Sequence, residues 1–364
     1  MINRLSAADQ ALGRLDGVAR TMPNANLFVA MYVRQEAVLS SRIEGTQSTL
    51  DDVLAFELDA RNQDVPRDVD EVVNYVRAMN YGLDRAASLP PSRRLIREIH
   101  RELLEGVRGA DKRPGEFRTD QNWIGKGRVP IERATFVPPA PEDMDRALDD
   151  FERFLNGGAD LPPLIHCALA HAQFETIHPF LDGNGRVGRL LIAFLLCYRG
   201  ILHRPLLYLS AFLASNRVEY YDRLMAIRER GDWEGWLRFF LRGVAETADE
   251  ATRTAQGILE LRERHRKVLQ DAGVGQHAHR LLDVLFERPV INVSFAERSL
   301  GVTYATANKL VNQFQHLRVL DETTGQRRNR RYSYMPYLSL FEEHHQGPLD
   351  PSTAQTTETT STAR

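Results

Sequence analysis

Hydrophobic positions recur at helical spacing through most of the first 270 residues of the chain, whereas strand-like alternation is scarce. The spacing predicts three N-terminal helices, which are Leu27 to Glu44, Thr49 to Ala60 and Val69 to Ala87. A second helical block is predicted from Ser92 to about Ala248, and a charged amphipathic connector helix from Ala251 to Gln270. The fold is therefore expected to be mainly α-helical.

One stretch, Phe117 to Val137, departs from this helical pattern. It has two short β-favouring pieces, around Trp123-Ile124 and around Thr135-Phe136-Val137. Turn-forming residues lie between the two pieces, at Gly125, Gly127 and Pro130. Prolines end the stretch before a new helix from Glu142. We interpret the stretch as a small β-hairpin, called the flap below, on the helical core.

Residues 276–341 form a distinct module that resembles a winged helix-turn-helix. Its predicted helices are His277 to Glu287, Phe295 to Leu300 and Tyr304 to Leu317, and its predicted hairpin is Leu320 to Tyr334. A basic wing in the hairpin could meet DNA phosphates, and its residues are Arg327, Arg328, Arg330 and Arg331. The side chains that could face a DNA groove are Thr303, Thr306, Asn308 and Lys309. The predicted recognition helix, Tyr304 to Leu317, has a single basic residue before Arg318. Protein contacts or dimerisation are therefore an equal alternative to DNA binding.

These patterns divide the chain into five parts. They are an N-terminal helical segment at 1–90, a helical core at 91–250, a connecting helix at 251–275, the winged-helix module at 276–341 and a tail at 342–364. The tail has no large apolar residue beyond Leu349, so we expect it to be disordered.

The composition narrows the class of protein. Hydrophobic residues make up 43% of the chain and charged residues 26%, both ordinary for a soluble globular protein, and a net charge of −2 excludes a polycation that coats nucleic acid. Cys167 and Cys197 lie in apolar helical stretches, where buried thiols in a reducing compartment are expected. There is no apolar signal-peptide core and no run of about 18 apolar residues, so we expect a cytoplasmic protein without membrane contact.

The most informative segment is His178 to Arg189, HPFLDGNGRVGR, which joins two predicted helices. Gly183 and Gly185 flank Asn184 and allow the main-chain N–H groups to turn inward. The helix that follows supplies further free N–H groups and a dipole that favours an anion. The segment therefore predicts a loop that binds phosphate.

Four side chains add chemistry to this loop. Arg186 and Arg189 are three residues apart at the helix start, and their guanidinium groups suit phosphate oxygens. Asp182 is a hard oxygen ligand that suits Mg²⁺ next to phosphates. His178 has the near-neutral pKa of a general base. Together these residues predict a Mg²⁺-nucleotide site with its own base.

The segment resembles the signature of the Fic family, His-x-Phe-x-Asp/Glu-Gly-Asn-Gly-Arg-x-x-Arg. Every fixed position is matched, by His178, Phe180, Asp182, Gly183, Asn184, Gly185, Arg186 and Arg189. The resemblance covers roughly residues 1–340, because the segments HAQFETIHPF, LYLSAFLASNRVEYYDRL and DWEGWLRFFLRG also fit. It implies a helical Fic core with a β-hairpin flap, and nucleotidyltransferase activity with ATP and Mg²⁺.

The resemblance implies a role for each loop residue. His178 would accept the proton of a Ser, Thr or Tyr hydroxyl, whose oxygen attacks the α-phosphate of ATP while pyrophosphate leaves. Asp182 would hold Mg²⁺, and Phe180 would be a buried pin for the loop. Main-chain N–H groups and the Asn184 side chain would stabilise the transferring phosphate, and the two arginines would grip the β- and γ-phosphates. The nucleotide-binding residues would be Gly183, Asn184, Gly185, Arg186, Val187, Gly188 and Arg189.

A second segment, SSRIEG, lies at the end of the first predicted helix. Ser40 and Glu44 are four residues apart and share a helix face, and Gly45 suits the left-handed position that ends a helix. The segment resembles the family's inhibitory motif, Ser/Thr-x-x-x-Glu-Gly/Asn, in the class with an upstream inhibitory helix. This implies that Glu44 pairs with Arg189 and takes the place of the ATP γ-phosphate, which turns the α-phosphate away from in-line attack.

The resemblance also assigns the flap and an aromatic residue. The flap would hold an extended segment of the target protein by β-augmentation, with Trp123-Ile124-Gly125 near the nucleotide and the acceptor hydroxyl. Tyr220 would line the adenine pocket, although Tyr221 competes for this place. The residues Trp233, Trp236 and His171 are expected to pack rather than to bind a ligand.

Three functions fit these observations. The leading one is an autoinhibited protein adenylyltransferase that uses ATP and Mg²⁺ and modifies target proteins and itself, with a homodimer as an option. A second is a Fic enzyme that removes AMP, with Glu44 positioning a water, or that transfers another phosphate-containing group. A third is a DNA-binding regulator with an idle Fic core, against which the intact His178 and Asp182 argue.

Overall fold

The structure is a computed structural model, and it describes every residue except 23–24, 59–65, 67, 87, 126–128, 158–159, 327–329 and 343–364. The predictions for Gly127, Arg327, Arg328 and nearly all of the tail lie outside the described residues. The α-helices are, in chain order, α1 (Ile2–Thr21), α2 (Ala25–Ile43), α3 (Leu50–Leu58), α4 (Val69–Ala86), α5 (Arg93–Leu104), α6 (Pro141–Asn156), α7 (Pro163–Ile177), α8 (Asn184–Tyr198), α9 (Ser210–Ser215), α10 (Arg217–Arg230), α11 (Trp233–Asp271), α12 (Gln276–Glu287), α13 (Val293–Leu300), α14 (Tyr304–His316) and α15 (Met335–Glu342). The other elements are a 3-10 turn, η1 (Ile131–Arg133), and the short strands β1 (Val290–Ile291), β2 (Asp321–Glu322) and β3 (Tyr332–Ser333). The fold is mainly α, as the sequence predicts.

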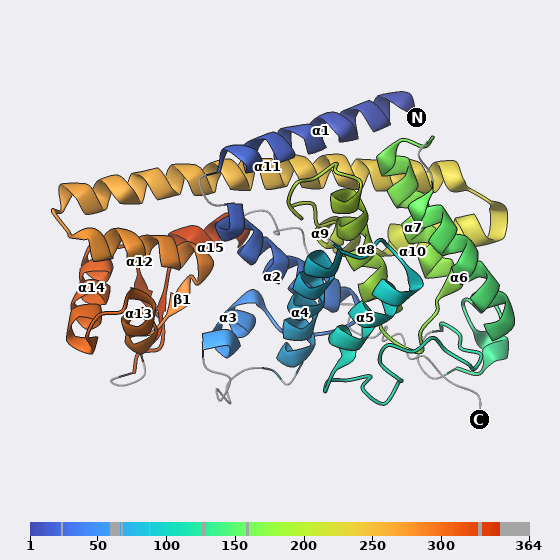
Figure 1. Ribbon diagram of the computed structural model, residues 1–364, viewed down its shortest axis with the longest axis horizontal. Helices are drawn as coiled ribbons and strands as arrows, with labels where there is room; N and C mark the ends of the chain where they lie inside the picture. The colour runs from blue at the N-terminus through green and yellow to red at the C-terminus, as the bar shows by residue number, and fades with distance from the viewer. Residues whose placement is uncertain are drawn as a thin grey trace.

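The longest helix, α11, spans 39 residues and runs along the length of the molecule (Figure 1). It begins where the Asp232 carboxylate accepts a 2.9 Å hydrogen bond from the amide of Gly235, which satisfies a free N–H group of the first turn. The connector expected from Ala251 to Gln270 is not a separate helix but the second half of α11. The alanine- and charge-rich sequence from Val244 to Gln256 contains no proline or glycine that would stop the helix.

The first helix, α1, lies along α11 and is one that the hydrophobic pattern fails to predict. Its buried face consists largely of small residues, Ala8, Ala11 and Ala19, with Leu12 and Leu15 between them. Alanine favours a helix but contributes little apolar area, so such a face gives a weak hydrophobic signal in the sequence.

Helices α7 and α8 pack against each other at the centre of the helical core. Every residue of α8 from Arg186 to Leu196 is buried, which explains why this segment is apolar all round apart from its arginines. Helices α2, α4 and α5 pack on α8, and α6, α10 and α11 pack on α7. Helix α7 ends at Ile177, directly before His178, and α8 begins at Asn184, so the predicted loop does join two helices.

The C-terminal elements pack directly on α2. Arg34 of α2 bonds the Glu57 carboxylate at 2.8 Å, and Arg288, which follows α12, reaches the same carboxylate at 3.7 Å. The Gln35 side chain donates to the carbonyl of Phe341 on α15 at 3.1 Å. Helix α2, which leads to Glu44, is therefore held between the helical core and the C-terminal elements.

The C-terminal elements follow the order α12, β1, α13, α14, β2 and β3. The strands form an antiparallel sheet of order β1-β3-β2, with Ile291 opposite Tyr332 and Asp321 opposite Ser333. The three predicted helices and the predicted hairpin are thus present, and the caps Asn292 and Thr303 start α13 and α14. The assignment of this module as a winged helix stays a prediction.

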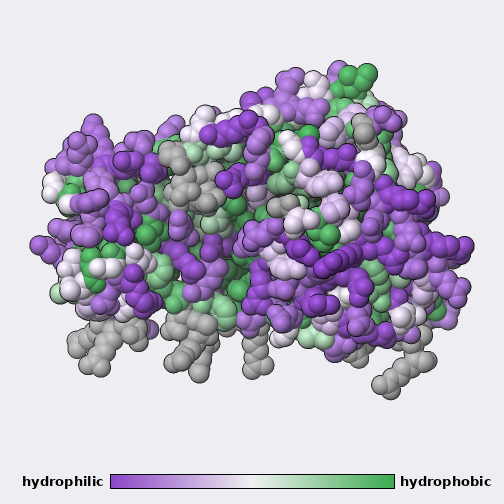
Figure 2. All heavy atoms as spheres, viewed as in Figure 1, coloured by the Kyte–Doolittle hydropathy of each residue, from purple (hydrophilic) through white to green (hydrophobic). Residues whose placement is uncertain are grey.

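The face of the molecule in Figure 2 is mostly hydrophilic, and its hydrophobic residues appear in small separate groups. None of the helices in the described ranges combines the length and apolar character needed to cross a membrane.

Candidate active site

His178 stands at the junction between α7 and the phosphate-binding loop. It adopts the left-handed conformation, with φ 49° and ψ 60°, and its amide donates to the carbonyl of Phe174 at 2.9 Å. This conformation costs a residue with a Cβ roughly 1–2 kcal/mol. Strained residues of this kind concentrate at functional sites, so the backbone itself marks His178.

The imidazole of His178 is buried and neutral. The residue is 6% exposed, and its Nδ1 has no hydrogen-bond partner among the described residues. Burial, together with the guanidinium groups of Arg228 and Arg118, lowers the pKa of His178 to about 3, although Glu44 opposes the shift. A neutral imidazole with an unused nitrogen is the state that a general base needs before its substrate arrives.

The buried ring of Phe180 holds the loop in place. Its ring is fully buried and stacks on the ring of His100 from α5, with centroids 3.7 Å apart and planes 6° from parallel. His100 accepts a 2.8 Å hydrogen bond from the amide of Gly115 at Nδ1, so its other nitrogen donates to the carbonyl of Asp182 at 2.9 Å. Burial lowers the pKa of His100 to about 4, which agrees with the neutral form that both bonds require.

The Asn184 side chain is engaged within the loop. Its Oδ1 accepts from the amide of Phe180 at 2.8 Å, and its Nδ2 donates to the carbonyl of Phe180 at 2.8 Å. Both ends of the amide therefore close the turn, and Asn184 shapes the loop at the start of α8. Contact of this side chain with a phosphate stays a prediction.

The start of α8 forms an anion site. Gly183 is the N-cap, with φ 79°, a conformation that favours glycine. A Cβ at Gly185 would collide with Oε1 of Glu44 and would lie 2.9 Å from Nη1 of Arg189. The carboxylate of Glu44 therefore lies against the first turn of α8, where free N–H groups and the helix dipole favour a negative charge.

Arg189 binds this carboxylate directly. Its Nη2 donates to Oε1 of Glu44 at 2.6 Å and to the carbonyl of Ser40 at 3.0 Å, and its Nε donates to Oγ of Ser40 at 2.7 Å. The Arg189 side chain is 2% exposed and that of Glu44 13%. Burial alone would lower the pKa of Arg189, but the nearby Glu44 and tyrosines raise it above its ordinary value. The structure thus brings together the three residues Ser40, Glu44 and Arg189 as the inhibitory motif implies, with α2 ending at Ile43 and Gly45 at φ 96°.

A buried polar chain continues from Ser40 into the protein. The hydroxyl of Tyr75 bonds Ser40 and also donates to Glu36 at 3.1 Å. Glu36 accepts further bonds from the hydroxyl of Ser210 at 2.6 Å and from its amide at 3.3 Å. Burial raises the pKa of Glu36 to about 7, although these donors oppose the shift. The chain joins α2, α4 and α9 behind Arg189, so the arginine has a defined position.

The neighbours of Arg189 have other partners. Arg186 is 1% exposed and lies between Glu71 of α4, at 3.3 Å, and Asp182, at 3.5 Å. The side chain of Val187 is in the core, and Gly188 packs against Glu175 of α7. Both positions thus pack α8 on its neighbours, and a contact of Val187 or Gly188 with a nucleotide stays a prediction.

Asp182 suits the Mg²⁺ ion that the signature implies. Its side chain is 33% exposed, and its Oδ1 accepts from the amide of Gly183 at 2.6 Å. A Cβ at Gly109 would lie 2.9 Å from Oδ2, so glycine there keeps this side of the carboxylate open. The described residues hold no group of three or more His, Cys, Asp or Glu that could bind a metal. One carboxylate with substrate phosphates and waters is nevertheless a common Mg²⁺ site.

The flap is pinched at a single antiparallel bridge within the described residues. The amide of Ile124 donates to the carbonyl of Phe136 at 2.8 Å, and the amide of Phe136 donates back at 3.1 Å. Trp123 is 5% exposed, and its indole N–H donates to the carbonyl of Val129 at 2.7 Å. The two predicted β-favouring pieces do pair, but through one bridge only, and the 3-10 turn η1 lies between them. Within the described residues the flap is therefore not a regular hairpin.

The aromatic residues near the site are mostly core. Tyr220 is 1% exposed, and its hydroxyl bonds Nε2 of His171 at 2.9 Å, while Nδ1 of His171 bonds the carbonyl of Gly188 at 3.0 Å. Because the Tyr220 ring is buried, neither of its faces is open to an adenine ring. Tyr221 beside it is half-buried and is the alternative. The adenine-binding role stays a prediction. Trp236 is buried as expected, whereas Trp233 is 38% exposed.

The sequence did not indicate several residues around the loop, which come from distant segments: Glu71, His100, Arg118 and Arg228.

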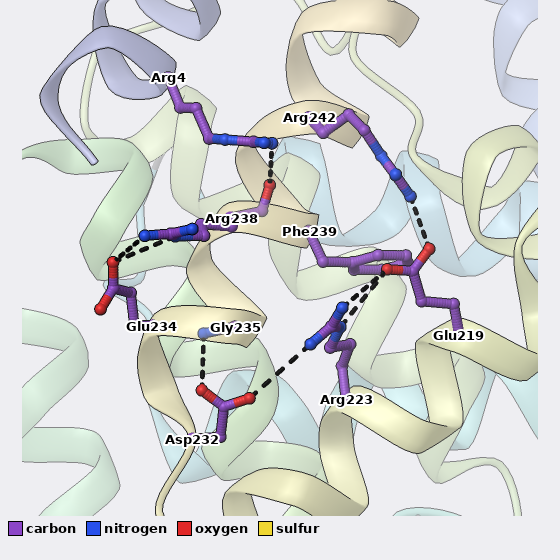
Figure 3. A pocket seen from close by; sticks show the side chains of 9 residues that line it. All are labelled: Arg4, Glu219, Arg223, Asp232, Glu234, Gly235, Arg238, Phe239 and Arg242. Atoms are coloured by element: carbon purple, nitrogen blue, oxygen red, sulfur yellow. Dashed lines mark hydrogen bonds and ion pairs between the residues drawn. The ribbon is translucent and has the colours of Figure 1, made fainter.

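A separate polar cleft of about 460 Å³ lies between α1, α10 and α11 (Figure 3). Arg223 pairs with Glu219 at 3.2 Å and Arg238 with Glu234 at 2.5 Å, whereas Arg4 donates to the carbonyl of Arg238 at 3.5 Å. The cleft does not contain the predicted site residues.

Comparisons with known proteins identify two family regions. The profile described as "Fic/DOC family N-terminal" matches residues 2–84, and the profile described as "Fic/DOC family" matches residues 90–196. Among curated proteins, the protein adenylyltransferase Fic of Drosophila yakuba is 33% identical over 156 residues, and that of Drosophila melanogaster is 32% identical over 156 residues. Both matches cover 42% of this chain and 28% of the relative, so the chain spans little more than a quarter of the length of these relatives.

Solved structures share the fold. A Fic family protein from Desulfovibrio desulfuricans superposes with a TM-score of 0.57 and 19% identity, over 92% of this chain and 95% of that chain. Fic-1 from C. elegans superposes with a TM-score of 0.52 and 24% identity, over 70% of this chain and 72% of that chain.

Proposed function

Because the chain belongs to the Fic/DOC family, we propose that it transfers AMP from ATP to hydroxyl side chains of proteins and that its own Glu44 restrains the reaction. The names of the Drosophila relatives support AMP transfer. The observation that carries the proposal is a neutral, buried His178 with an unused Nδ1, next to the anion site at the start of α8.

In this reaction the acceptor oxygen of a Ser, Thr or Tyr side chain forms a bond to the α-phosphorus of ATP. The bond from that phosphorus to the bridging oxygen of the β-phosphate breaks, and pyrophosphate leaves with the electron pair. The hydroxyl proton passes to the imidazole of His178 and from there to solvent. His178 must be neutral to take this proton, and burial with two flanking arginines keeps it so.

The rest of the loop would bind the phosphates. The first turn of α8 offers free main-chain N–H groups, and Arg189 offers its guanidinium once Glu44 withdraws. Asp182 would hold Mg²⁺, which when bound neutralises charge on the phosphates. Arg186 bonds Asp182 and Glu71, so it would orient the metal-binding carboxylate as well as add positive charge.

The position of the Glu44 carboxylate supports the proposed restraint of AMP transfer. Its carboxylate lies on Arg189 and against Gly185, which is where an anion binds at the start of α8. A γ-phosphate that needs the same guanidinium must displace it. Nucleotide can still bind elsewhere along the loop, but the α-phosphate is then out of line with the acceptor hydroxyl.

The target protein would lie along the flap, and the chain itself would be one acceptor. An extended segment can add to the backbone near Ile124, where the flap has its single described bridge. The exposed start of α14 (Thr303, Tyr304, Thr306 and Lys309) would give the C-terminal module, as a winged helix, a surface for DNA.

The proposal is tested by incubating the full chain, as wild type and as the variants Glu44→Gly and Glu44→Gly/His178→Ala, with ATP and Mg²⁺. Intact-mass measurement should show addition of AMP to the Glu44→Gly protein, with release of pyrophosphate. The double variant should lose this addition while still binding ATP, since a general base contributes about 10²–10⁴-fold to the rate. Equal AMP addition by the double variant would overturn the role of His178. Loss of AMP from a modified protein, faster with Glu44 than without it, would instead favour AMP removal.

A further inference from the structure

Arg228 is a residue of α10 that lies outside the signature yet touches both the flap and the end of α7. Its Cζ lies 3.7 Å from the centre of the Phe136 ring, so the guanidinium group covers the ring face. Its Nη2 donates to the carbonyl of Glu175 at 2.9 Å, and its Nε lies 3.4 Å from Oγ1 of Thr176. One side chain thus contacts the flap at its bridge and the helix turn that ends in His178.

The contact with α7 has a physical reason. The last carbonyls of a helix lack partners within that helix, and a cation near them is favoured by the helix dipole. Arg228 supplies both a donor and a charge to the carbonyl of Glu175, three residues before His178. It therefore holds the last turn of α7, whose end sets the left-handed conformation of His178.

The contact of Arg228 with the flap adds to hydrogen bonds that hold the ends of the flap. Arg118 donates to the carbonyls of His178, at 3.0 Å, and of Pro139, and Asn122 donates to the carbonyl of Phe180 at 2.9 Å. These bonds fix the two ends of the flap to the loop. Phe136, which pairs with Ile124 further out, is joined to the core by Arg228.

We propose that Arg228 is a positioning residue that couples the flap to the general base: it holds Phe136 and the end of α7 at a fixed separation, so that a hydroxyl bound along the flap meets the imidazole of His178. This inference rests on the proposed function and extends it to a residue of α10. Its contacts are with Phe136 and the end of α7, so it acts through Phe136 and His178.

The coupling should be visible in the rate of transfer. A misplacement of about 1 Å at a reacting centre can cost roughly 10²-fold in rate. In the Glu44→Gly protein, Arg228→Met should therefore lower kcat about 10–100-fold and leave the KM for ATP unchanged. Phe136→Leu should lower kcat similarly, and adding it to Arg228→Met should cause little further loss, because the two residues act as one unit. Arg228→Lys keeps the charge but loses the planar fork, so it should lose most of the rate.

The acid limb of the pH profile separates this role from simple destabilisation. The charged groups that face His178 are Arg228, Arg118 and Glu44. Arg228→Met removes a cation that lowers the pKa of His178, so the acid limb should move to higher pH, whereas Arg228→Lys should leave it near its original place. The matched control is Arg223→Met, on the same helix but in the cleft of Figure 3, paired with Glu219 and Asp232; it should change neither kcat nor the pH profile.

Two measurements do not depend on transfer activity. Amide hydrogen exchange at Ile124 and Phe136 should speed up in Arg228→Met, and the NMR titration of the His178 imidazole should move to higher pH. If the Glu44→Gly protein transfers nothing, the proposed function fails, and these two readouts still decide the role of Arg228. Unchanged exchange together with an unchanged titration, or a wild-type kcat in Arg228→Met, would overturn the proposal.

Discussion

The contact between Glu44 and Arg189 gives the most quantitative prediction of this structure. Replacing Glu44 with glycine removes the carboxylate that lies on the guanidinium group, and Gly45 already ends the helix at the next position. The substitution should leave the fold of α2 intact, because Ser40 still bonds Arg189 through its hydroxyl and its carbonyl. What changes is the occupant of the anion site.

The size of the effect follows from the geometry. The Nη2–Oε1 distance is 2.6 Å, with side-chain exposures of 2% for Arg189 and 13% for Glu44. A hydrogen bond between charged groups contributes about 1.5–3 kcal/mol to the state that contains it. A competing state favoured by this much leaves only about 1–10% of bound ATP in the productive arrangement. Glu44→Gly should therefore raise the transfer rate roughly 10–100-fold.

The assay is the initial rate of AMP incorporation at saturating ATP, with Glu44→Gln as the matched variant. The glutamine keeps the shape and a weaker, uncharged hydrogen bond, so it should give an intermediate rate. Ser40→Ala should activate less than Glu44→Gly, since it weakens the support of Arg189 but leaves the competing carboxylate in place. A lower rate in Glu44→Gly than in wild type would refute the reasoning, because Glu44 would then take part in the chemistry.

Three further predictions concern the metal, stability and the C-terminal module. Asp182→Ala should lose Mg²⁺-dependent transfer and EDTA should have the same effect, whereas full transfer in EDTA would contradict the metal role. Burial raises the pKa of Glu36 from an ordinary 4.5 to about 7, so the native state keeps a proton that the unfolded chain releases; the free energy of unfolding should fall as pH rises from about 5 to 8. Glu36→Gln should reduce this fall by about 3 kcal/mol in urea titrations, and an unchanged slope would refute the assignment. If the module binds DNA, affinity should drop steeply with salt, and alanine at Arg330 and Arg331 should flatten that dependence; no binding at low salt would favour protein contacts.

The site features that are best predicted from the sequence are those formed by one short segment of the chain. The loop from His178 to Arg189 contains its own turn, helix start and charges, so its local structure follows from short-range geometry. The motif with Ser40 and Glu44 is also local, and its contact with Arg189 could be inferred only through the family resemblance. Helix ends set by side-chain caps or left-handed residues, such as the end of α7, are likewise predictable.

Residues that reach the site from elsewhere give no such signal. Arg118 and Arg228 look like ordinary surface cations in the sequence, and only tertiary packing brings them to the main chain around His178. The bonds that the Asn184 side chain makes within the loop also give no signal in the sequence. An amide can serve the loop or a ligand, and the choice depends on where the main chain of Phe180 lies. Helix α1 was not predicted, because the alanines of its buried face contribute little to the hydrophobic pattern.

The measurement that tests the central claim most directly is label transfer from ATP labelled at either the α- or the γ-phosphate. The Glu44→Gly protein, with Mg²⁺, should retain label on protein only from α-labelled ATP, and Glu44→Gly/His178→Ala should retain neither. This result would show that AMP is transferred and that His178 is required. Retention of label from γ-labelled ATP, or equal α-label in the double variant, would contradict the account.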